Sequence, residues 1–161
     1  MFVEHYPHVF AYARRRSPED AADVVSEVFL TAWRRLDELP TDALPWLFAV
    51  ARRTIANARR SAARRSSVPF ADPASVSDAE STVIERVEVA RAFRRLSERD
   101  REVLMLVAWD GLTPARAARV LGCSVHTFHV RLHRARARLA RALEVGDSVE
   151  RPSALAPGEG E

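Results

Sequence analysis

The chain has 161 residues, of which 47% are hydrophobic and 29% are charged, with a single cysteine. This length allows one medium domain or two small domains with packed cores. One cysteine excludes an internal disulfide, and no apolar run approaches the ~18 to 20 residues that span a bilayer. The first residues, MFVEHYPHVF, lack the basic-then-apolar order of a signal peptide. We therefore expect a globular, cytoplasmic protein that has no contact with a membrane.

The net charge of +3 hides an uneven distribution along the chain. Residues 1–65 carry 11 arginines against 8 acidic residues, and residues 91–143 carry 12 against 4. The segments 66–90 and 144–161 each carry 1 arginine against 5 acidic residues. Basic segments of this kind attract polyanions. There is no lysine, and arginine suits bidentate contacts with phosphate and guanine, although a GC-rich genome would give the same bias.

Helical periodicity dominates the first basic segment, and no stretch is typical of a strand. Apolar residues recur at helical spacing from Phe2 to Ala13, and Ser17 is expected to cap a second helix that has Pro18 at its first position. A loop with two prolines, Asp37 to Pro45, precedes a third helix that runs into an arginine-rich end. The sequence thus predicts three helices before residue 66.

The second basic segment predicts four more helices after a linker rich in Ser, Pro and Asp. The first covers Val83 to Leu96, with Val87 on its inner face, and the next is capped by Ser97 and ends at Asp110-Gly111. A short helix to Leu121, a turn at Gly122-Cys123 and a long helix capped by Ser124 follow as a helix-turn-helix.

The long final helix has one apolar side and one polar side. At ~100° per residue, one side carries Val125, Phe128, Leu132, Ala135 and Leu139. We expect this side to pack on the domain and the opposite side to enter the major groove of DNA.

The segment CSVHTFHVRLHRAR, residues 123–136, would also be flagged in a search for metal sites. His126, His129 and His133 share one sector of the helix, but residues seven apart are separated by ~10 Å along the axis, too far for one tetrahedral ion. Three neighbouring arginines also disfavour a cation. We therefore expect no metal and no cofactor, and we interpret the histidines as DNA-reading residues, with structural histidines as the alternative.

Two ordered regions resemble one protein family. Residues 20–33, DAADVVSEVFLTAW, with residues 45–52, PWLFAVAR, resemble domain two of the extracytoplasmic-function (ECF) sigma factors of bacterial RNA polymerase, in the sigma-70 family. Residues 96–104, LSERDREVL, and the helix-turn-helix resemble their domain four. The resemblance implies an all-α fold of two small helical domains joined by a flexible linker. The expected boundaries are 1–65 for the region 2 domain, 66–80 for the linker, 81–143 for the region 4 domain and 144–161 for an acidic disordered tail.

The resemblance also implies which residues act. Those expected to bind core RNA polymerase are Asp20, Asp23, Ser26 and Glu27. Those expected to bind the minus-10 element are Leu39, Thr41, Arg52, Arg53, Asn57, Arg59 and Arg60. Those expected to bind the minus-35 element are His126, Thr127, His129, Val130, Arg131, His133, Arg134 and Arg136.

The polymerase-binding assignment and a DNA contact at Trp46 each have a simpler structural alternative. Asp20, Asp23 and Glu27 lie at i, i+3 and i+7, so they form an acidic stripe for a basic partner or a merely solvated helix face. Trp46 could stack on a base, but its spacing favours the core.

The function expected from the resemblance is promoter-specific initiation of transcription. The protein would bind core polymerase, recognise the two promoter elements and help melt the DNA, with an anti-sigma factor as a further partner. We see no phosphate-binding glycine loop or catalytic triad, so no enzyme is expected. The alternatives are a helix-turn-helix regulator that acts without polymerase, which would not need the acidic stripe, and an adaptor that contacts only protein.

Overall fold

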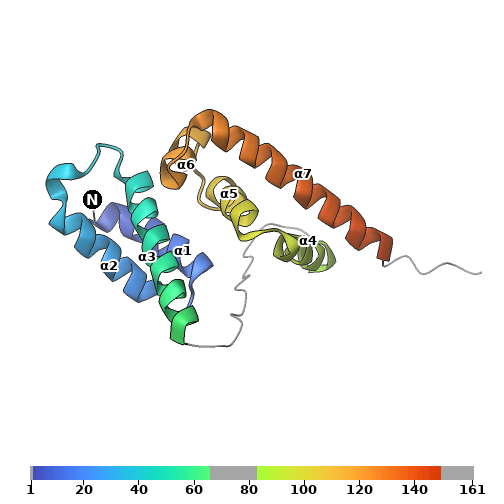
Figure 1. Cartoon of the computed structure of the whole chain (residues 1–161), viewed down its shortest axis with the longest axis horizontal. Helices are drawn as coiled ribbons and strands as arrows, with labels where there is room; N and C mark the ends of the chain where they lie inside the picture. Colours follow the sequence, from blue (N-terminus) through green and yellow to red (C-terminus); the bar gives the residue numbers. More distant parts are fainter. Residues whose placement is uncertain (1, 66–82, 150–161) are drawn as a thin grey trace, which may run out of the picture.

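The computed structural model describes residues 2–65 and 83–149, and in these two ranges the chain forms seven α-helices and one short 3-10 helix, with no strand (Figure 1). The expectation of an all-α fold is confirmed. None of the helices in these ranges combines the length and apolar character that crossing a membrane requires. The predicted linker, 66–80, lies outside the described residues, as does the part of the predicted tail that begins at residue 150.

The first helical group consists of α1 (Phe2–Arg16), α2 (Ala21–Arg34), the 3-10 helix η1 (Leu36–Glu38) and α3 (Ala43–Arg65). The three α-helices pack against one another, because each presents a stripe of apolar residues to the other two. Tyr12 of α1 is fully buried, and its ring stacks on Phe48 of α3 with 4.5 Å between the ring centroids. Trp46 is half-buried against this core, in agreement with its predicted core position.

The start of α2 differs from the prediction. Ser17 does not cap the helix, since its backbone N–H donates to the carbonyl of Ala13 at 2.7 Å and so completes α1. Its hydroxyl donates to the carboxylate of Asp20 at 2.9 Å. The helix begins at Ala21, with Asp20 as the N-cap residue. A four-residue turn therefore separates two helices that the sequence suggested were almost continuous.

The second helical group consists of α4 (Val83–Arg95), α5 (Glu98–Ala108), α6 (Pro114–Leu121) and α7 (Val125–Val149). The long helix α7 packs against the other three (Figure 1). Phe128, Leu132 and Ala135 are buried, as the predicted apolar side of this helix requires. Val125 is 44% exposed, because the first residue of α7 lies beyond the end of the core, and Val87 of α4 is 42% exposed where an inner position was predicted.

Local capping explains where α5, α6 and α7 begin and end. The side chains of Ser97, Thr113 and Ser124 each accept a hydrogen bond from the backbone N–H three residues later, which confirms the caps predicted at Ser97 and Ser124. After α6, Gly122 has φ 65°, a left-handed conformation, and the N–H of Cys123 donates to Ala118 at 3.0 Å in a Schellman motif. This turn sets the angle between the two helices of the helix-turn-helix.

The helix α7 runs through residue 149, so the first six residues of the predicted disordered tail, 144–149, are helical instead. The prediction rested on Pro152, Pro157 and the five acidic residues from Glu144 onward, and two of those acids, Glu144 and Asp147, lie within the helix. The one glycine among residues 144–149 costs a helix only about 1 kcal/mol. Proline, which does end a helix, first occurs after this point at Pro152.

The two helical groups are docked on each other. Helix α3 lies beside α6, and the buried apolar residues of both groups form one cluster (Figure 1). Segments distant in sequence, the end of α1 and the segment from α5 to Asp110, therefore meet at a common interface.

Candidate nucleic-acid interface

The acidic stripe lies on the outer face of α2. Asp20, Asp23, Ser26 and Glu27 are all exposed, on the side opposite the buried residues that pack on α1 and α3. The hydroxyl of Ser26 donates to the backbone carbonyl of Ala22 at 2.9 Å, so its hydrogen-bond donor already has a partner within the helix. The structure brings these four predicted residues together on one surface.

Two large apolar side chains lie on the same helix and were missed by sequence reasoning. Leu30 is 43% exposed and Trp33 is 73% exposed. Both positions fall outside the buried stripe of α2, and Trp33 was considered only as part of a family motif. An exposed tryptophan beside carboxylates is typical of a protein-binding surface.

The residues predicted to bind the minus-10 element are divided between the loop before α3 and the outer face of α3. Thr41, Arg52 and Arg53 are exposed, whereas Leu39 is half-buried and packs against the core. Arg60 donates to the side-chain oxygen of Asn57, so these two exposed residues form a pair.

Arg59 lies apart from the other predicted minus-10 residues. One nitrogen of its guanidinium donates to the backbone carbonyl of Arg16 at 2.6 Å, and the other binds the carboxylate of Glu98 in the second helical group. In this arrangement Arg59 holds the two groups together, a role that sequence reasoning did not foresee.

The residues predicted to bind the minus-35 element lie on α7, away from its buried side. Six of them are exposed: His126, His129, Arg131, His133, Arg134 and Arg136. Val130 is half-buried, as is Thr127, whose hydroxyl lies 2.8 Å from that of Ser124 at the helix cap. Arg138, on the same helix, donates to both carboxylate oxygens of Asp100 at 2.8 and 2.9 Å and belongs to the fold.

The cysteine and histidines of this helix do not form a metal cage. Within residues 2–65 and 83–149, no three or more Cys, His, Asp or Glu side chains are arranged to hold a metal ion. Cys123 is half-buried and packs against the core from the turn after α6.

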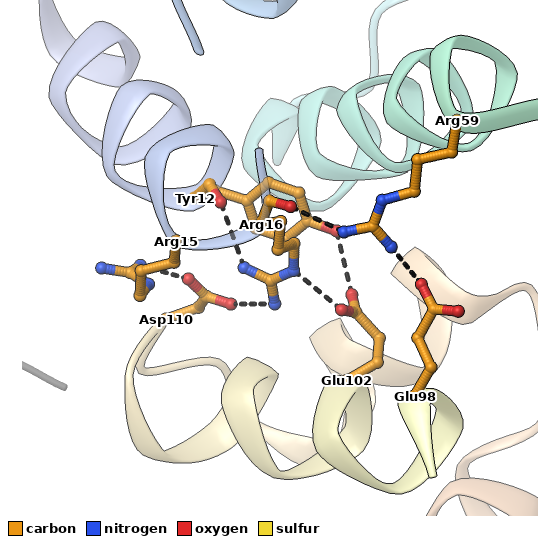
Figure 2. Close-up of polar contacts among 7 residues, drawn as sticks. All are labelled: Tyr12, Arg15, Arg16, Arg59, Glu98, Glu102 and Asp110. Carbon is orange, nitrogen blue, oxygen red and sulfur yellow. Dashed lines mark hydrogen bonds and ion pairs between the residues drawn. The ribbon is translucent and has the colours of Figure 1, made fainter. Parts of the chain in front are cut away.

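A buried polar cluster joins α1 to the second helical group, and sequence reasoning missed it (Figure 2). Arg16 donates to Glu102 at 2.7 Å and to Asp110 at 2.7 Å, and its side chain is only 7% exposed. The hydroxyl of Tyr12 donates to the other oxygen of Glu102 at 2.9 Å, and Arg15 binds the other oxygen of Asp110, whose side chain is fully buried. From the sequence, Asp110 was interpreted only as part of a turn.

The surroundings of this cluster change how its members titrate. Burial raises the pKa of Tyr12 well above its ordinary value of 10.0, and the nearby Glu102 carboxylate raises it further. Burial alone would lower the pKa of Arg16, but the surrounding Tyr12, Glu102 and Asp110 raise it above its ordinary value. Both groups therefore keep their protons at any physiological pH, and the cluster stays hydrogen-bonded.

A second polar contact between the groups lies at the loop before α3. Arg116 of α6 donates two hydrogen bonds to Asp42, both at 2.9 Å, and Arg119 binds the same carboxylate. Burial alone would raise the pKa of Asp42, but the hydrogen bonds and charges of Arg119 and Arg116 lower it below its ordinary value of 3.8. The loop predicted to read DNA is thus held by the first helix of the helix-turn-helix.

Comparison with known proteins agrees with this arrangement. The family model described as "Sigma-70 region 2" matches residues 1–65, and "Sigma-70, region 4" matches residues 86–139. The ECF RNA polymerase sigma factor SigL of Mycobacterium tuberculosis is 33% identical over 143 residues, which cover 83% of this chain and 81% of SigL.

Two solved structures are also similar. The sigma factor RpoE from Bartonella quintana, in complex with the anti-sigma factor NepR, is 25% identical with a TM-score of 0.70, covering 89% of this chain and 94% of RpoE. CnrH, in complex with the cytosolic domain of CnrY, is 29% identical with a TM-score of 0.63, covering 89% of this chain and 85% of CnrH.

The two matched regions and the identity to SigL define the class: the chain belongs to the sigma-70 family. Within that family it is an ECF RNA polymerase sigma factor, a polymerase-binding subunit that directs transcription.

Proposed function

We propose a division of labour between the two helical groups of this sigma factor. Residues 1–65 bind core polymerase and read and melt the minus-10 element, residues 81–143 read the minus-35 element, and residues 66–80 join them. The observation that carries this proposal is that one chain presents an exposed acidic face on α2 and an exposed Arg and His face on α7. A protein that binds only DNA does not need an exposed acidic face such as that of α2.

The acidic face of α2 suits a basic surface of polymerase. Asp23 and Glu27 are exposed, and Asp20 lies at the N-terminal end of the helix. Complementary charges steer the encounter, and the exposed side chains of Leu30 and Trp33 supply apolar area that a complex can bury. This combination favours stable docking over a merely solvated face.

Minus-10 recognition is assigned to the loop before α3 and the outer face of α3. A base that leaves the duplex loses its stacking, which costs a few kcal/mol, and contacts in a protein loop can replace it. Leu39 and Thr41 would contact the displaced bases, while Arg52 and Arg53 would bind the adjacent phosphates. The exposure of these two arginines on one helix supports that role.

Minus-35 recognition is assigned to the outer face of α7, the second helix of the helix-turn-helix. Arg134, near the centre of this face, would contact base edges, and Arg131, on its flank, would bind phosphate. His126, His129 and His133 add donors and acceptors that distinguish base pairs in the major groove.

Sigma factors are generally initiation factors without catalytic activity of their own, and we propose the same for this chain, in the cytoplasm. An anti-sigma factor is a further proposed partner, because RpoE and CnrH are each similar to this chain and were solved in complex with NepR and CnrY. Such a partner would compete with polymerase or DNA for the faces described above.

Reconstitution tests the proposal. The full chain is mixed with core polymerase and genomic DNA, and the start sites of the transcripts are mapped by sequencing. We expect start sites that share two upstream elements and that disappear when the chain is omitted. Start sites identical to those from core polymerase alone would overturn the proposal.

The docking surface is tested by the double variant Asp23→Ala/Glu27→Ala, with Glu4→Gln as the matched control. Glu4 is an exposed acid of α1 that lies near His5, outside the stripe. We expect the double variant to lose at least tenfold in affinity for core polymerase, if each carboxylate contributes about 1 kcal/mol. Equal affinity of the double variant and the control would exclude the stripe as the docking surface.

A further inference from the structure

We propose that this chain reads duplex DNA with protonated histidines, so that binding of the outer face of α7 is coupled to the uptake of protons. The residues assigned to this role are His129 and His133, both exposed on that face. The inference deepens the proposed function and rests on it, because it concerns the same surface that is assigned to the minus-35 element. It adds that the affinity of this surface for DNA changes with pH near neutrality.

Three histidines form one exposed strip along the first turns of α7. His126, His129 and His133 follow one another at i, i+3 and i+7, and all three are exposed. At ~100° per residue they fall within ~60° of the helix circumference. The buried side of the helix, with Phe128 and Leu132, faces the core instead. A duplex that binds the outer face of α7 therefore meets the three imidazoles together. We refer to these three residues as the histidine strip.

The part of α7 that carries the histidine strip has basic residues and no acidic ones. Between Val125 and Leu143 the helix contains five arginines and no Asp, Glu, Asn or Gln. The first acidic residue of the helix, Glu144, lies 11 residues after His133, which is about 16 Å along the axis. No carboxylate of α7 itself can therefore act as a counter-ion for the imidazoles.

The acidic side chains on the helices packed against α7 do not pair with the strip. Three acids of α5 each bind an arginine outside the strip: Glu98, Asp100 and Glu102. The carboxylate of Asp110, after α5, is bound by arginines of α1. Helix α6 contains no acidic residue, and on α4 the acidic side chain that the structure describes is that of Glu88. Within residues 2–65 and 83–149, none of these carboxylates forms a hydrogen bond or ion pair with an imidazole of the strip.

The other charged side chains described on these helices are positive. They are Arg91, Arg94 and Arg95 on α4, Arg99 and Arg101 on α5, and Arg116 and Arg119 on α6. A further group that can titrate is the thiol of Cys123, which is half-buried in the turn before α7. A positive charge on the strip therefore has no counter-ion among the described residues of the free protein, and a bound polyanion supplies one.

Position along the helix separates His126 from the other two histidines. His126 is the second residue of α7, at the positive end of the helix dipole, which disfavours a cation. His129 and His133 lie beyond this first turn, four residues apart on one face. Two positive charges at this spacing repel each other until phosphates neutralise them. We therefore assign the proton uptake to His129 and His133, whereas His126 reads DNA as a neutral ring.

Protonation changes what an imidazole recognises. A neutral imidazole has one hydrogen-bond donor and one acceptor, whereas the protonated ring has two donors and no acceptor. Its partners on DNA are therefore acceptor atoms, which are the phosphate oxygens and the O6 and N7 atoms of guanine. The proton comes from solvent and stays on the ring while the DNA is bound. Histidine is the side chain that ordinarily changes charge between pH 5 and 8, so DNA affinity is highest at the acidic end of this range and falls as the pH rises.

The first test measures the affinity of the full chain for a mixed-sequence duplex at pH 6 and pH 8, at constant ionic strength, by fluorescence anisotropy. We expect the wild type to bind about tenfold or more tightly at pH 6, because each proton taken up changes log K by up to one per pH unit. The double variant His129→Gln/His133→Gln keeps polar side chains that cannot be charged, so its affinity should be the same at both pH values. The control His8→Gln, at an exposed histidine of α1, should keep the wild-type pH dependence. A pH effect that persists in the double variant, or its absence from the wild type, would overturn the inference.

A variant with permanent charges checks the same point from the other side. His129→Arg/His133→Arg should bind more tightly than the wild type at pH 8 and lose its pH dependence, and a wild-type pH profile in this variant would contradict the assignment. The salt dependence of the wild type distinguishes the two kinds of acceptor. A slope of log K against log salt that is steeper at pH 6 by about 0.9 per imidazole assigns the contacts to phosphate, whereas an equal slope with the pH effect retained assigns them to guanine.

Transcription by the holoenzyme separates this inference from the proposed function. The wild type and His129→Gln/His133→Gln are compared at a promoter found by start-site mapping, with the sigma factor limiting. We expect the ratio of wild-type to variant transcript to rise about tenfold from pH 8 to pH 6, since pH effects on polymerase itself cancel in the ratio. A ratio that is the same at both pH values would refute proton coupling and leave the proposed function standing. If neither protein directs specific starts at either pH, the proposed function fails, and the duplex measurements still decide whether the histidines take up protons.

Discussion

Replacing Arg131 by alanine should reduce the salt dependence of binding to duplex DNA, and replacing Arg138 should not. Both side chains are exposed on α7, and that of Arg138 is 52% exposed, so exposure does not distinguish them. Their contacts do, because Arg138 donates to both carboxylate oxygens of Asp100 and so stabilises the fold. Arg131 lies on the flank of the proposed DNA-reading face of α7, where we expect a phosphate contact.

The magnitude follows from counterion release. Each phosphate contact contributes about 0.9 to the slope of log K against log salt, so between 50 and 200 mM salt one lost contact makes the fall in affinity about 3.5-fold smaller. The assay is fluorescence anisotropy of a mixed-sequence duplex with the full chain, at several salt concentrations. We expect Arg138→Ala to keep the wild-type slope and to lower the urea midpoint of unfolding instead. Equal slopes for Arg131→Ala and the wild type would refute the assignment of Arg131 to phosphate.

Three further predictions concern the turn after α6 and the polar contacts between the two helical groups. Gly122→Ala should destabilise the protein by about 1 to 2 kcal/mol in urea unfolding, because alanine is strained at φ 65°, and Gly122→Asn should cost less. Tyr12→Phe should cost about 1 to 3 kcal/mol in the same assay, through the lost hydrogen bond to the Glu102 carboxylate. The Arg119 and Arg116 contacts lower the pKa of Asp42 below 3.8, so the contribution of this carboxylate to stability is complete above about pH 3.8 and is lost as the pH falls through the lower value. The difference in urea midpoint between the wild type and Asp42→Asn should therefore stay constant between pH 5 and 8 and shrink below pH 4, and a difference that changes between pH 5 and 8 would contradict this.

Sequence reasoning was reliable where a local pattern decides the structure. The caps at Ser97 and Ser124 and the turn at Gly122 depend on residues within a few positions of one another, and all three are present. It failed at Ser17 and at the end of α7, where two local preferences compete. At Ser17 the backbone completes α1 before α2 begins, and over residues 144–149 helix formation outweighs the acidic composition that favoured disorder.

For the candidate functional residues too, local patterns were predicted correctly and contacts between distant residues were not. The acidic stripe and the outer side of α7 were predicted because helical spacing alone puts their residues on one face. The use of Arg59 in a contact between the groups was not predictable, since Glu98 lies 39 residues away and nothing local links the two. The exposed position of Trp33 was also missed, because Trp33 was considered only as part of the family motif and not for its burial.

The sequence by itself determined the family, the seven described helices and the two faces that we propose for binding polymerase and DNA, because periodicity, caps and ordered motifs depend on residues close together in the chain. Only the tertiary structure decided that Arg16 is buried between Glu102 and Asp110, and that Asp42 is held by α6. These contacts join residues 74 to 94 positions apart, and the residues next to a charged side chain in the sequence do not indicate which distant residue it will bind. The contact between the two helical groups therefore depends on the shapes and charges of two folded surfaces.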